Sequence, residues 1–462
     1  MSTAADASEG RRRAVLVVAI LASFVAFLDG TVVNVALPAI TRELGGGLAV
    51  QQWVVDGYLI TLGALILVAG SLADRIGRAR SMTIGLIGFG VTSLLCAVAP
   101  TAEVLIVARM LQGAAGAILV PSSLALIIAT VHGAAQARTI GAWTAWTGTA
   151  TIAGPVIGGL LVDAGSWRYV FALNVLPIVI TLLLLRRLGQ VDSGTNVPID
   201  GVGAMLGVIG LGGPVFALIE QERLGFGDPL VLTALIVGVA ALIGFVLWER
   251  RTPHPMLPLS LFASRNFTVG NVSTAFVYGA LSFGFFALGL YLQQSLGFSA
   301  TLAGLATLPP TILLLLLSQV AGSLTARFGP RVFMGLGPII AGAGFVLLAG
   351  VRPPADYATQ LLPGILLFGF GLAVTVAPLT STILGAVASE HSGVGSAVNN
   401  AVSRIAGLVA IAATGLIVGP TLDADGFSRA AVATAVLLFA GGLVSLLGIR
   451  NPTPTSETEP AP

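Results

Sequence analysis

The chain has 462 residues, of which 56% are hydrophobic and only 9% are charged, with a formal net charge of +2. A soluble globular protein carries about 25% charged residues, so this composition excludes one and predicts an integral membrane protein. The single cysteine, Cys96, excludes an internal disulfide, and the three histidines are scattered, so no metal site is expected. Every basic residue is arginine, which rules out the lysine of an ATP-binding GxxxxGK[ST] loop. An ion gradient remains as the energy source, and we expect no cofactor, no nucleic-acid partner and no enzyme activity.

Fourteen apolar segments are long enough to cross a bilayer core, which needs about 20 helical residues. They are 14–38, 50–72, 81–99, 103–130, 138–163, 168–188, 201–220, 229–249, 268–295, 302–326, 332–350, 359–387, 396–418 and 428–449. The predicted fold class is therefore an all-α integral membrane protein. Residues 1–13 are expected to form a short tail, and the polar, proline-rich residues 450–462 a disordered one.

The distribution of arginine predicts the orientation of these helices. With the N-terminus in the cytoplasm, the inside loops and ends hold fifteen arginines and the outside loops five. Such an excess is typical of cytoplasmic loops. We therefore expect a multi-pass protein of the cell membrane with both termini in the cytoplasm.

A short sequence repeat divides the chain into two halves. GSLADRIGRAR at 70–80 reappears in weaker form as GSLTARFGPR at 322–331, in each case after the second helix of a six-helix block. The repeat predicts an N-terminal bundle at 14–190, a two-helix insertion at 201–250 and a C-terminal bundle at 268–449. Parallel repeats of this kind place the substrate path between the two halves.

Three charged residues lie inside the first bundle at a comparable depth. Asp29 lies in the first apolar segment, Asp56 in the second and Arg109 in the fourth, all in the predicted outer half of the membrane. Charge in a membrane span is costly, by roughly 2.5–3.5 kcal/mol on insertion scales, and marks ion or substrate sites. We expect a proton-coupling or substrate cluster of these three residues. The alternatives are a structural ion pair between Asp56 and Arg109 or a water-exposed Asp56.

The repeated loop motif contains Gly70, Asp74, Arg75, Gly77 and Arg78. Its glycines permit a tight turn and close helix packing. Asp74 can complement a helix N-terminus, and residues 395–396 are expected on the same side of the membrane. The motif therefore predicts a latch between the halves, with topogenic charge as the alternative.

GTATIAGPVIGG at 148–159 places Gly154, Pro155, Gly158 and Gly159 within one apolar segment. Proline kinks a helix, and glycines let a neighbouring helix approach closely. This segment is expected either to support a rocking motion or simply to pack.

A further set of side chains could line a substrate cavity, since such cavities combine aromatic walls with a few polar groups. Arg404 has no membrane carboxylate in its own half, so Asn399, Asn400 or backbone carbonyls are its candidate partners. The candidate lining residues are Asn34, Trp143, Trp146, Tyr278, Asn399 and Arg404.

Several motifs resemble one known family in sequence and in order. LDGTVVNVALP at 28–38, GSLADRIGRAR, RMLQG at 109–113 and GTATIAGPVIGG resemble signatures of the major facilitator superfamily, and specifically of its fourteen-helix drug:proton antiporters. The resemblance implies two six-helix bundles plus two central helices, and the fourth motif is similar to the antiporter motif. It also implies proton-coupled export of drugs or other small amphipathic compounds by alternating access.

The expected partners are the lipid bilayer, protons and an apolar or cationic small molecule, and the protein is expected to be a monomer. The alternatives are a dedicated exporter or symporter for one metabolite, or a non-transporting membrane receptor with the same fold.

Overall fold

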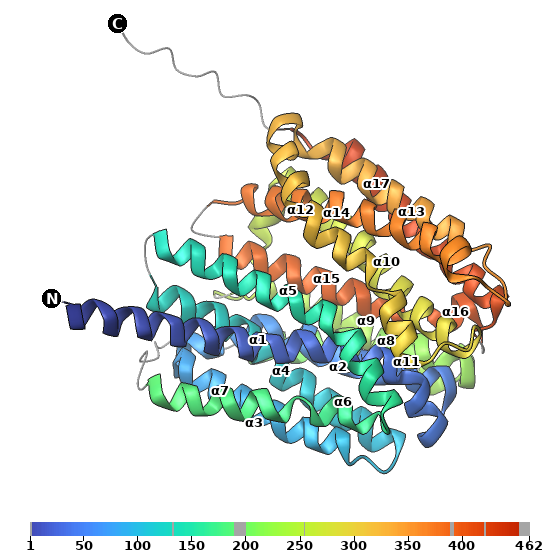
Figure 1. Ribbon diagram of the computed structural model, residues 1–462, viewed down its shortest axis with the longest axis horizontal. Helices are drawn as coiled ribbons and strands as arrows, with labels where there is room; N and C mark the ends of the chain where they lie inside the picture. Colours follow the sequence, from blue (N-terminus) through green and yellow to red (C-terminus); the bar gives the residue numbers. More distant parts are fainter. Residues whose placement is uncertain are drawn as a thin grey trace, which may run out of the picture.

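The computed structural model describes residues 2–131, 134–188, 200–253, 255–388, 392–419 and 422–451, and every regular element in these ranges is a helix (Figure 1). The helices of the N-terminal half are α1 (Ser2–Leu44), α2 (Gly47–Ile76), α3 (Arg78–Ala97), α4 (Ala102–Thr130), α5 (Ala134–Asp163), α6 (Arg168–Ala172) and α7 (Val175–Leu188). Two central helices follow, α8 (Gly201–Leu224) and α9 (Pro229–Glu249). The C-terminal half comprises η1 (Leu259–Ala263), α10 (Arg265–Gln294), α11 (Ala300–Ala306), α12 (Pro309–Phe328), α13 (Pro330–Leu348), η2 (Tyr357–Leu361), α14 (Leu362–Gly385), α15 (Ser392–Ala412), α16 (Thr414–Val418) and α17 (Ala424–Gly448).

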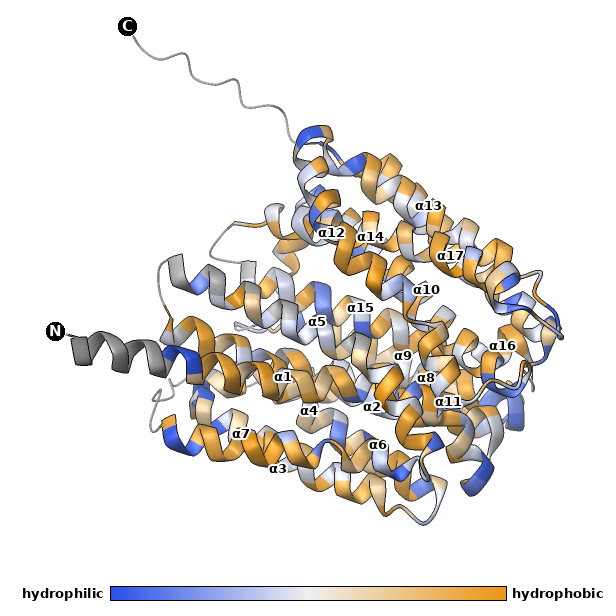
Figure 2. Ribbon diagram, viewed as in Figure 1, coloured by the Kyte–Doolittle hydropathy of each residue, from blue (hydrophilic) through white to orange (hydrophobic). Residues whose placement is uncertain are grey.

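Thirteen segments of the described chain are long and apolar enough to cross a membrane, counting each broken helix as one span. They correspond to thirteen of the fourteen predicted spans. The other, 138–163, lies in α5, where Ala153–Asp163 is a shorter apolar stretch. Hydrophobic colours cover most of the helices, while hydrophilic colours gather towards the helix ends (Figure 2). The predicted all-α membrane fold is confirmed.

The helices pack within two groups. In the N-terminal half α2 packs on α4, α1 on α5 and α3 on α4, and in the C-terminal half α13 packs on α14 and α17, and α10 on α15 and α17. Helix α8 packs on α9 and also on α2 and α15, one from each half. The halves meet directly through α5 with α11, α2 with α15, and α1 with α10. We call the end of the molecule that holds the α1–α2 turn the distal end.

Three predicted spans are broken in the structure. Residues 168–188 form α6 and α7, 302–326 form α11 and α12, and 396–418 form α15 and α16. The break before α12 has a clear cause, because Pro309 and Pro310 lack the N–H that a continuous helix needs and restrict the residue before them. At the chain ends, α1 begins at Ser2 and so includes most of the predicted tail, whereas 452–462 lie outside the described residues.

Both copies of the sequence repeat form the same turn. Gly77, between α2 and α3, has φ of +91°, and Gly329, between α12 and α13, has φ of +80°. L-residues with a side chain rarely adopt these angles, so the glycine in each copy is required by the backbone. The similarity of 70–80 to 322–331 therefore corresponds to a shared local structure.

Candidate functional site

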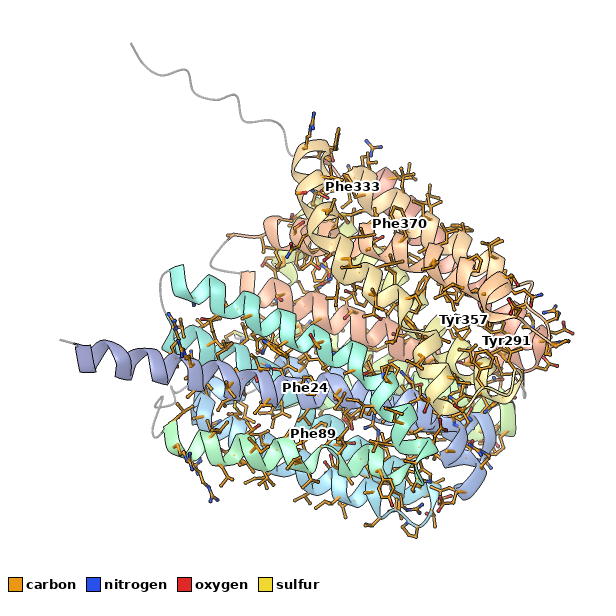
Figure 3. All side chains as sticks on the ribbon, viewed as in Figure 1. Phe24, Phe89, Tyr291, Phe333, Tyr357 and Phe370 are labelled. Atoms are coloured by element: carbon orange, nitrogen blue, oxygen red, sulfur yellow. The ribbon has the colours of Figure 1, made fainter. Side chains whose placement is uncertain are left out.

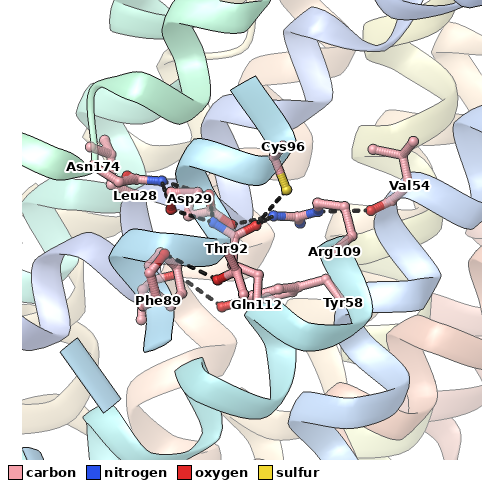
Figure 4. Close-up of polar contacts among 12 residues, drawn as sticks. Leu28, Asp29, Val54, Tyr58, Phe89, Thr92, Cys96, Arg109, Gln112 and Asn174 are labelled. Carbon is pink, nitrogen blue, oxygen red and sulfur yellow. Dashed lines mark hydrogen bonds and ion pairs between the residues drawn. The ribbon is translucent and has the colours of Figure 1, made fainter. Parts of the chain in front are cut away.

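Asp29 and Arg109 form an ion pair in the interior of the N-terminal half (Figure 4). Nη1 of Arg109 donates to Oδ2 of Asp29 over 2.5 Å. The Asp29 residue is 0% exposed and Arg109 is 1% exposed, so neither charge reaches water. Buried charges persist in an apolar interior only when they are paired and hydrogen-bonded, and this pair meets both conditions.

Amide side chains complete the coordination of the Asp29 carboxylate. Its Oδ1 accepts from Nε2 of Gln112 over 3.0 Å and from Nδ2 of Asn174 over 2.9 Å. Both amides also donate to Oγ of Ser93, over 2.8 Å and 3.3 Å. The carboxylate therefore accepts three hydrogen bonds, two from α4 through Arg109 and Gln112 and one from Asn174 in the turn between α6 and α7, and its orientation is fixed.

Arg109 uses its remaining surface on neighbouring groups. Its Nε donates to the backbone oxygen of Val54 over 3.0 Å, and its Nη1 donates to Oε1 of Gln112 over 2.7 Å. The guanidinium carbon lies 4.3 Å from the centre of the Tyr58 ring, a distance at which cation–π attraction is favourable. Sequence reasoning missed Gln112, Asn174 and Ser93. A signal was present, because Gln112 follows Arg109 by three residues and so shares its helix face.

Asp56 lies apart from this pair. It is 0% exposed, and neither of its carboxylate oxygens has a hydrogen-bond partner among the described residues. One turn earlier on α2, Nε2 of Gln52 donates to the carbonyls of Ile411 and Ala412 on α15, over 2.8 and 2.9 Å. Residues four apart share a helix face, so Asp56 lies on the stripe of α2 that faces the other half of the protein. The structure thus brings Asp29 and Arg109 together, and within the described part of the chain it leaves Asp56 unpaired.

The Gly/Pro-rich segment of α5 packs on both halves. Gly154 and Gly158 lie against Thr31 and Val32 of α1. Gly159 lies against the backbone of α11, where an added Cβ would be 2.5 Å from the oxygen of Ala300, and Gly304 of α11 lies against the Pro155 carbonyl in turn. Side chains at these crossing points would separate the helices, so α5 and α11 touch backbone to backbone.

A carboxylate at the end of α5 adds a polar contact to the same crossing. Oδ1 of Asp163 accepts from the backbone N–H of Ala300 over 3.2 Å, and Oδ2 accepts from that of Thr301 over 2.8 Å. These are the first amides of α11, which lack partners within their own helix. A side chain of one half therefore caps a helix of the other at the distal end.

Part of the loop motif lies in the described structure. Gly77 forms the turn, Arg75 is exposed and Arg78 is partly exposed. The surroundings of Gly70 and Asp74 lie outside the described residues. The predicted latch to 395–396 therefore stays a prediction.

The predicted cavity residues have different surroundings. Nε1 of Trp143 donates to Ser23 of α1, whereas Trp146 is 57% exposed. Nδ2 of Asn399 donates to Asn271 and Thr274 of α10, so it is not the partner of Arg404. Asn34, Tyr278 and Arg404 are partly exposed. Other aromatic side chains occupy both halves, with Phe24 and Phe89 in the first and Tyr291, Phe333, Tyr357 and Phe370 in the second (Figure 3).

A protein with many apolar spans, two similar halves and a buried ion pair inside one of them is a membrane transporter by class. Within the described residues, no three of His, Cys, Asp and Glu gather to hold a metal ion. Residues 19–410 and 270–462 match the Major Facilitator Superfamily, and the chain belongs to this family. The family predicted from the motifs is confirmed.

Several relatives are known by name. The chain is 36% identical to the puromycin resistance protein pur8 of Streptomyces alboniger, over 89% of this chain and 82% of the relative. It is 35% identical to the methylenomycin A resistance protein of Streptomyces coelicolor, over 96% and 93%. It is 30% identical to the tetracenomycin C resistance and export protein of Streptomyces glaucescens, over 90% and 77%. The crystal structure of the peptide transporter POT in complex with sulfate shares the fold, with a TM-score of 0.71 at 15% identity, over 95% of this chain and 94% of that one.

Proposed function

We propose that this chain exports small amphipathic compounds, including antibiotics, from the cytoplasm in exchange for protons. Its relatives are named for resistance to puromycin, methylenomycin A and tetracenomycin C, and one of them for export. The arginine bias supports an orientation with both termini in the cytoplasm and the distal end outside.

The observation that carries proton coupling is the contrast between two buried carboxylates. Protonating Asp29 would discard charge-assisted hydrogen bonds and leave the Arg109 charge unpaired at 1% exposure. Protonating Asp56 would lose no hydrogen bond and would remove an unpaired charge from a dry site. Asp56 is therefore the proton-carrying residue of this proposal, and the Asp29–Arg109 pair is the fixed charge of the same bundle.

Alternating access requires contacts between the halves that can break and form again. The α5–α11 crossing, the Asp163 cap and the Gln52 bonds to α15 all lie at the distal half of the molecule. They close that end between the two bundles, and outward opening would break them. Each is a contact between a side chain or glycine of one half and the backbone of the other, which allows separation without unfolding either half.

The test uses everted membrane vesicles with a pH-sensitive dye and with puromycin and methylenomycin A as probes. We expect either compound, added to respiring vesicles, to release protons from the lumen, and Asp56→Asn to abolish this release. Asp425→Asn, an exposed carboxylate in an ion pair with Arg352, is the control and should keep it.

Retained coupling in Asp56→Asn would refute the role of Asp56. The alternatives predict other outcomes. A dedicated exporter would respond to a single compound, a symporter would move protons and compound in the same direction, and a receptor would move neither.

A further inference from the structure

Arg404 is a membrane arginine without a polar partner in the described structure. It lies in α15, within the candidate span Gly393–Ala412. No hydrogen bond or ion pair joins its guanidinium to any described residue. The guanidinium carbon lies 5.8 Å from the centre of the Phe27 ring. Arginine stays charged at every physiological pH, so this charge cannot be removed by proton loss. Intramembrane arginines normally pair or line a pathway, and Arg404 has no pair in the ranges that the structure describes.

Arg404 lies at the interface between the two halves, which we call the seam. A Cβ added to Gly63 of α2 would be 3.9 Å from the Cβ of Arg404, and Phe27 belongs to α1. Helix α10, which carries Tyr278, also packs on α15. Arg404 and Phe27 are both partly exposed. A partly exposed cation therefore lies beside the Phe27 ring, where helices of both halves meet.

We propose that Arg404 binds an anionic group, a carboxylate or phenolate, on the aromatic compounds that this protein transports. A planar guanidinium binds a carboxylate through two parallel hydrogen bonds, and the neighbouring Phe27 ring can pack on the apolar body of the same molecule. This inference rests on the proposed export function and refines it. The sequence alone favoured an apolar or cationic substrate, whereas the unpaired positive charge of Arg404 attracts an anionic one.

The nearby carboxylates of the protein do not neutralise Arg404 in this structure. Both oxygens of Asp29 are occupied by Arg109, Gln112 and Asn174. Asp56 faces the same seam but makes no ion pair with any described residue. Two contacts give the register of α2 on α15: Gln52 bonds to Ile411 and Ala412, and Gly63 lies against Arg404. Asp56 lies between Gln52 and Gly63 on α2, so it lies opposite the helical turn of α15 that follows Arg404. A pairing of Arg404 with Asp56 is the competing explanation.

The experiment measures binding of three matched probes to the purified full-length protein. The probes are 1-pyrenebutyrate, the neutral 1-pyrenebutanol and the cation 1-pyrenebutylamine, and the readout is the concentration dependence of the unfolding temperature. Partition into detergent is the same for every variant. The variants are Arg404→Gln, Arg404→Lys and the control Arg251→Gln, which removes an exposed arginine outside the membrane spans.

We expect wild type and Arg251→Gln to bind pyrenebutyrate about tenfold or more tighter than pyrenebutanol, the range of a charge-assisted hydrogen bond. Arg404→Gln should remove this preference and leave the affinity for pyrenebutanol within about twofold. Arg404→Lys should keep part of it, because the charge remains while the planar fork is lost.

Three results would overturn the inference. They are the absence of saturable pyrenebutyrate binding, equal or tighter binding of the alcohol or the amine by wild type, and an acid preference that survives in Arg404→Gln. If Arg404 instead pairs with Asp56, then Arg404→Gln and Asp56→Asn will impair efflux non-additively and wild type will show no acid preference. Proton release in the vesicle assay is scored separately, so a wild-type protein that couples to protons but shows no preference for the acid refutes this inference alone.

Discussion

The Asp29–Arg109 pair allows a quantitative test of what holds the N-terminal half together. Removing one partner of a buried ion pair costs about 3–5 kcal/mol, because the other charge stays buried without compensation. In Asp29→Asn the Arg109 guanidinium keeps Val54, Gln112 and the Tyr58 ring, which places the expected loss near the lower end, about 3 kcal/mol. Arg109→Gln should cost a similar amount, since the carboxylate keeps Gln112 and Asn174. The double variant removes both charges, so its loss should be smaller than the sum of the single losses by about 2 kcal/mol.

The assay is unfolding of the purified protein by dodecyl sulfate in mixed micelles, with the free energy of unfolding compared for the two single variants and the double variant. The exposed pair of Arg352 and Asp425, whose side chains are 46% and 75% exposed, is the matched control. Its cycle should show a coupling of at most about 1 kcal/mol. If the buried cycle is additive to within about 0.5 kcal/mol, the pair does not act as a coupled unit and the reasoning fails.

Three further predictions concern two contacts between helices and one turn. Gly159→Leu should prevent closure of the distal end and abolish efflux, because the new Cβ would lie 2.5 Å from the Ala300 oxygen. Gly289→Ala is the control and should be tolerated, because a Cβ at that position would have no atom within 4 Å. Asp163→Ala should lengthen the distance between spin labels at Val98→Cys and Ala358→Cys on the two halves, and an unchanged distance distribution would contradict the cap. Gly77→Ala should destabilise the protein by about 1–3 kcal/mol, since φ is +91° there, and a smaller loss on dodecyl sulfate unfolding would contradict the strain.

Much of the fold could be predicted from the sequence, because membrane spans are long apolar segments and helix length is set by the bilayer. The helix breaks could be predicted only where a proline stands beside them, at Pro309 and Pro310 and at Pro177 in the first turn of α7. The break after Ala412 has no proline, and Gln52 of the other half binds the carbonyls of Ile411 and Ala412 there. A local pattern cannot reveal a partner that is 359 residues away in sequence.

The depth of the site residues along their helices could be predicted from the sequence, but the direction in which their side chains point could not. Counting residues placed Asp29, Asp56 and Arg109 at a similar level, because helical rise is constant. Which of two carboxylates faces the arginine depends on the rotation of each helix and on its neighbours. Tyr58 of α2 points to Arg109, while Asp56, two residues earlier, is turned by about 200° and faces away. Gln112 and Asn174, which hold the carboxylate, are polar residues in apolar segments, and the same cost argument that identified Asp29 applies to them in weaker form.

The two central helices contribute to the seam that holds Asp56. Helix α8 shares an apolar cluster with α2 and α15, and Nε1 of Trp53 on α2 donates to Glu220 of α8 over 2.9 Å. The buried members of this cluster are Ile60, Ala64, Leu211, Val215, Ile219, Leu408 and Ala412. Trp53 and Ile60 flank Asp56 by about one helical turn on either side, so α8 covers the flank of the seam at the level of the unpaired carboxylate. The insertion is therefore more than a connection, because α8 packs on a helix of each half beside a carboxylate that is 0% exposed.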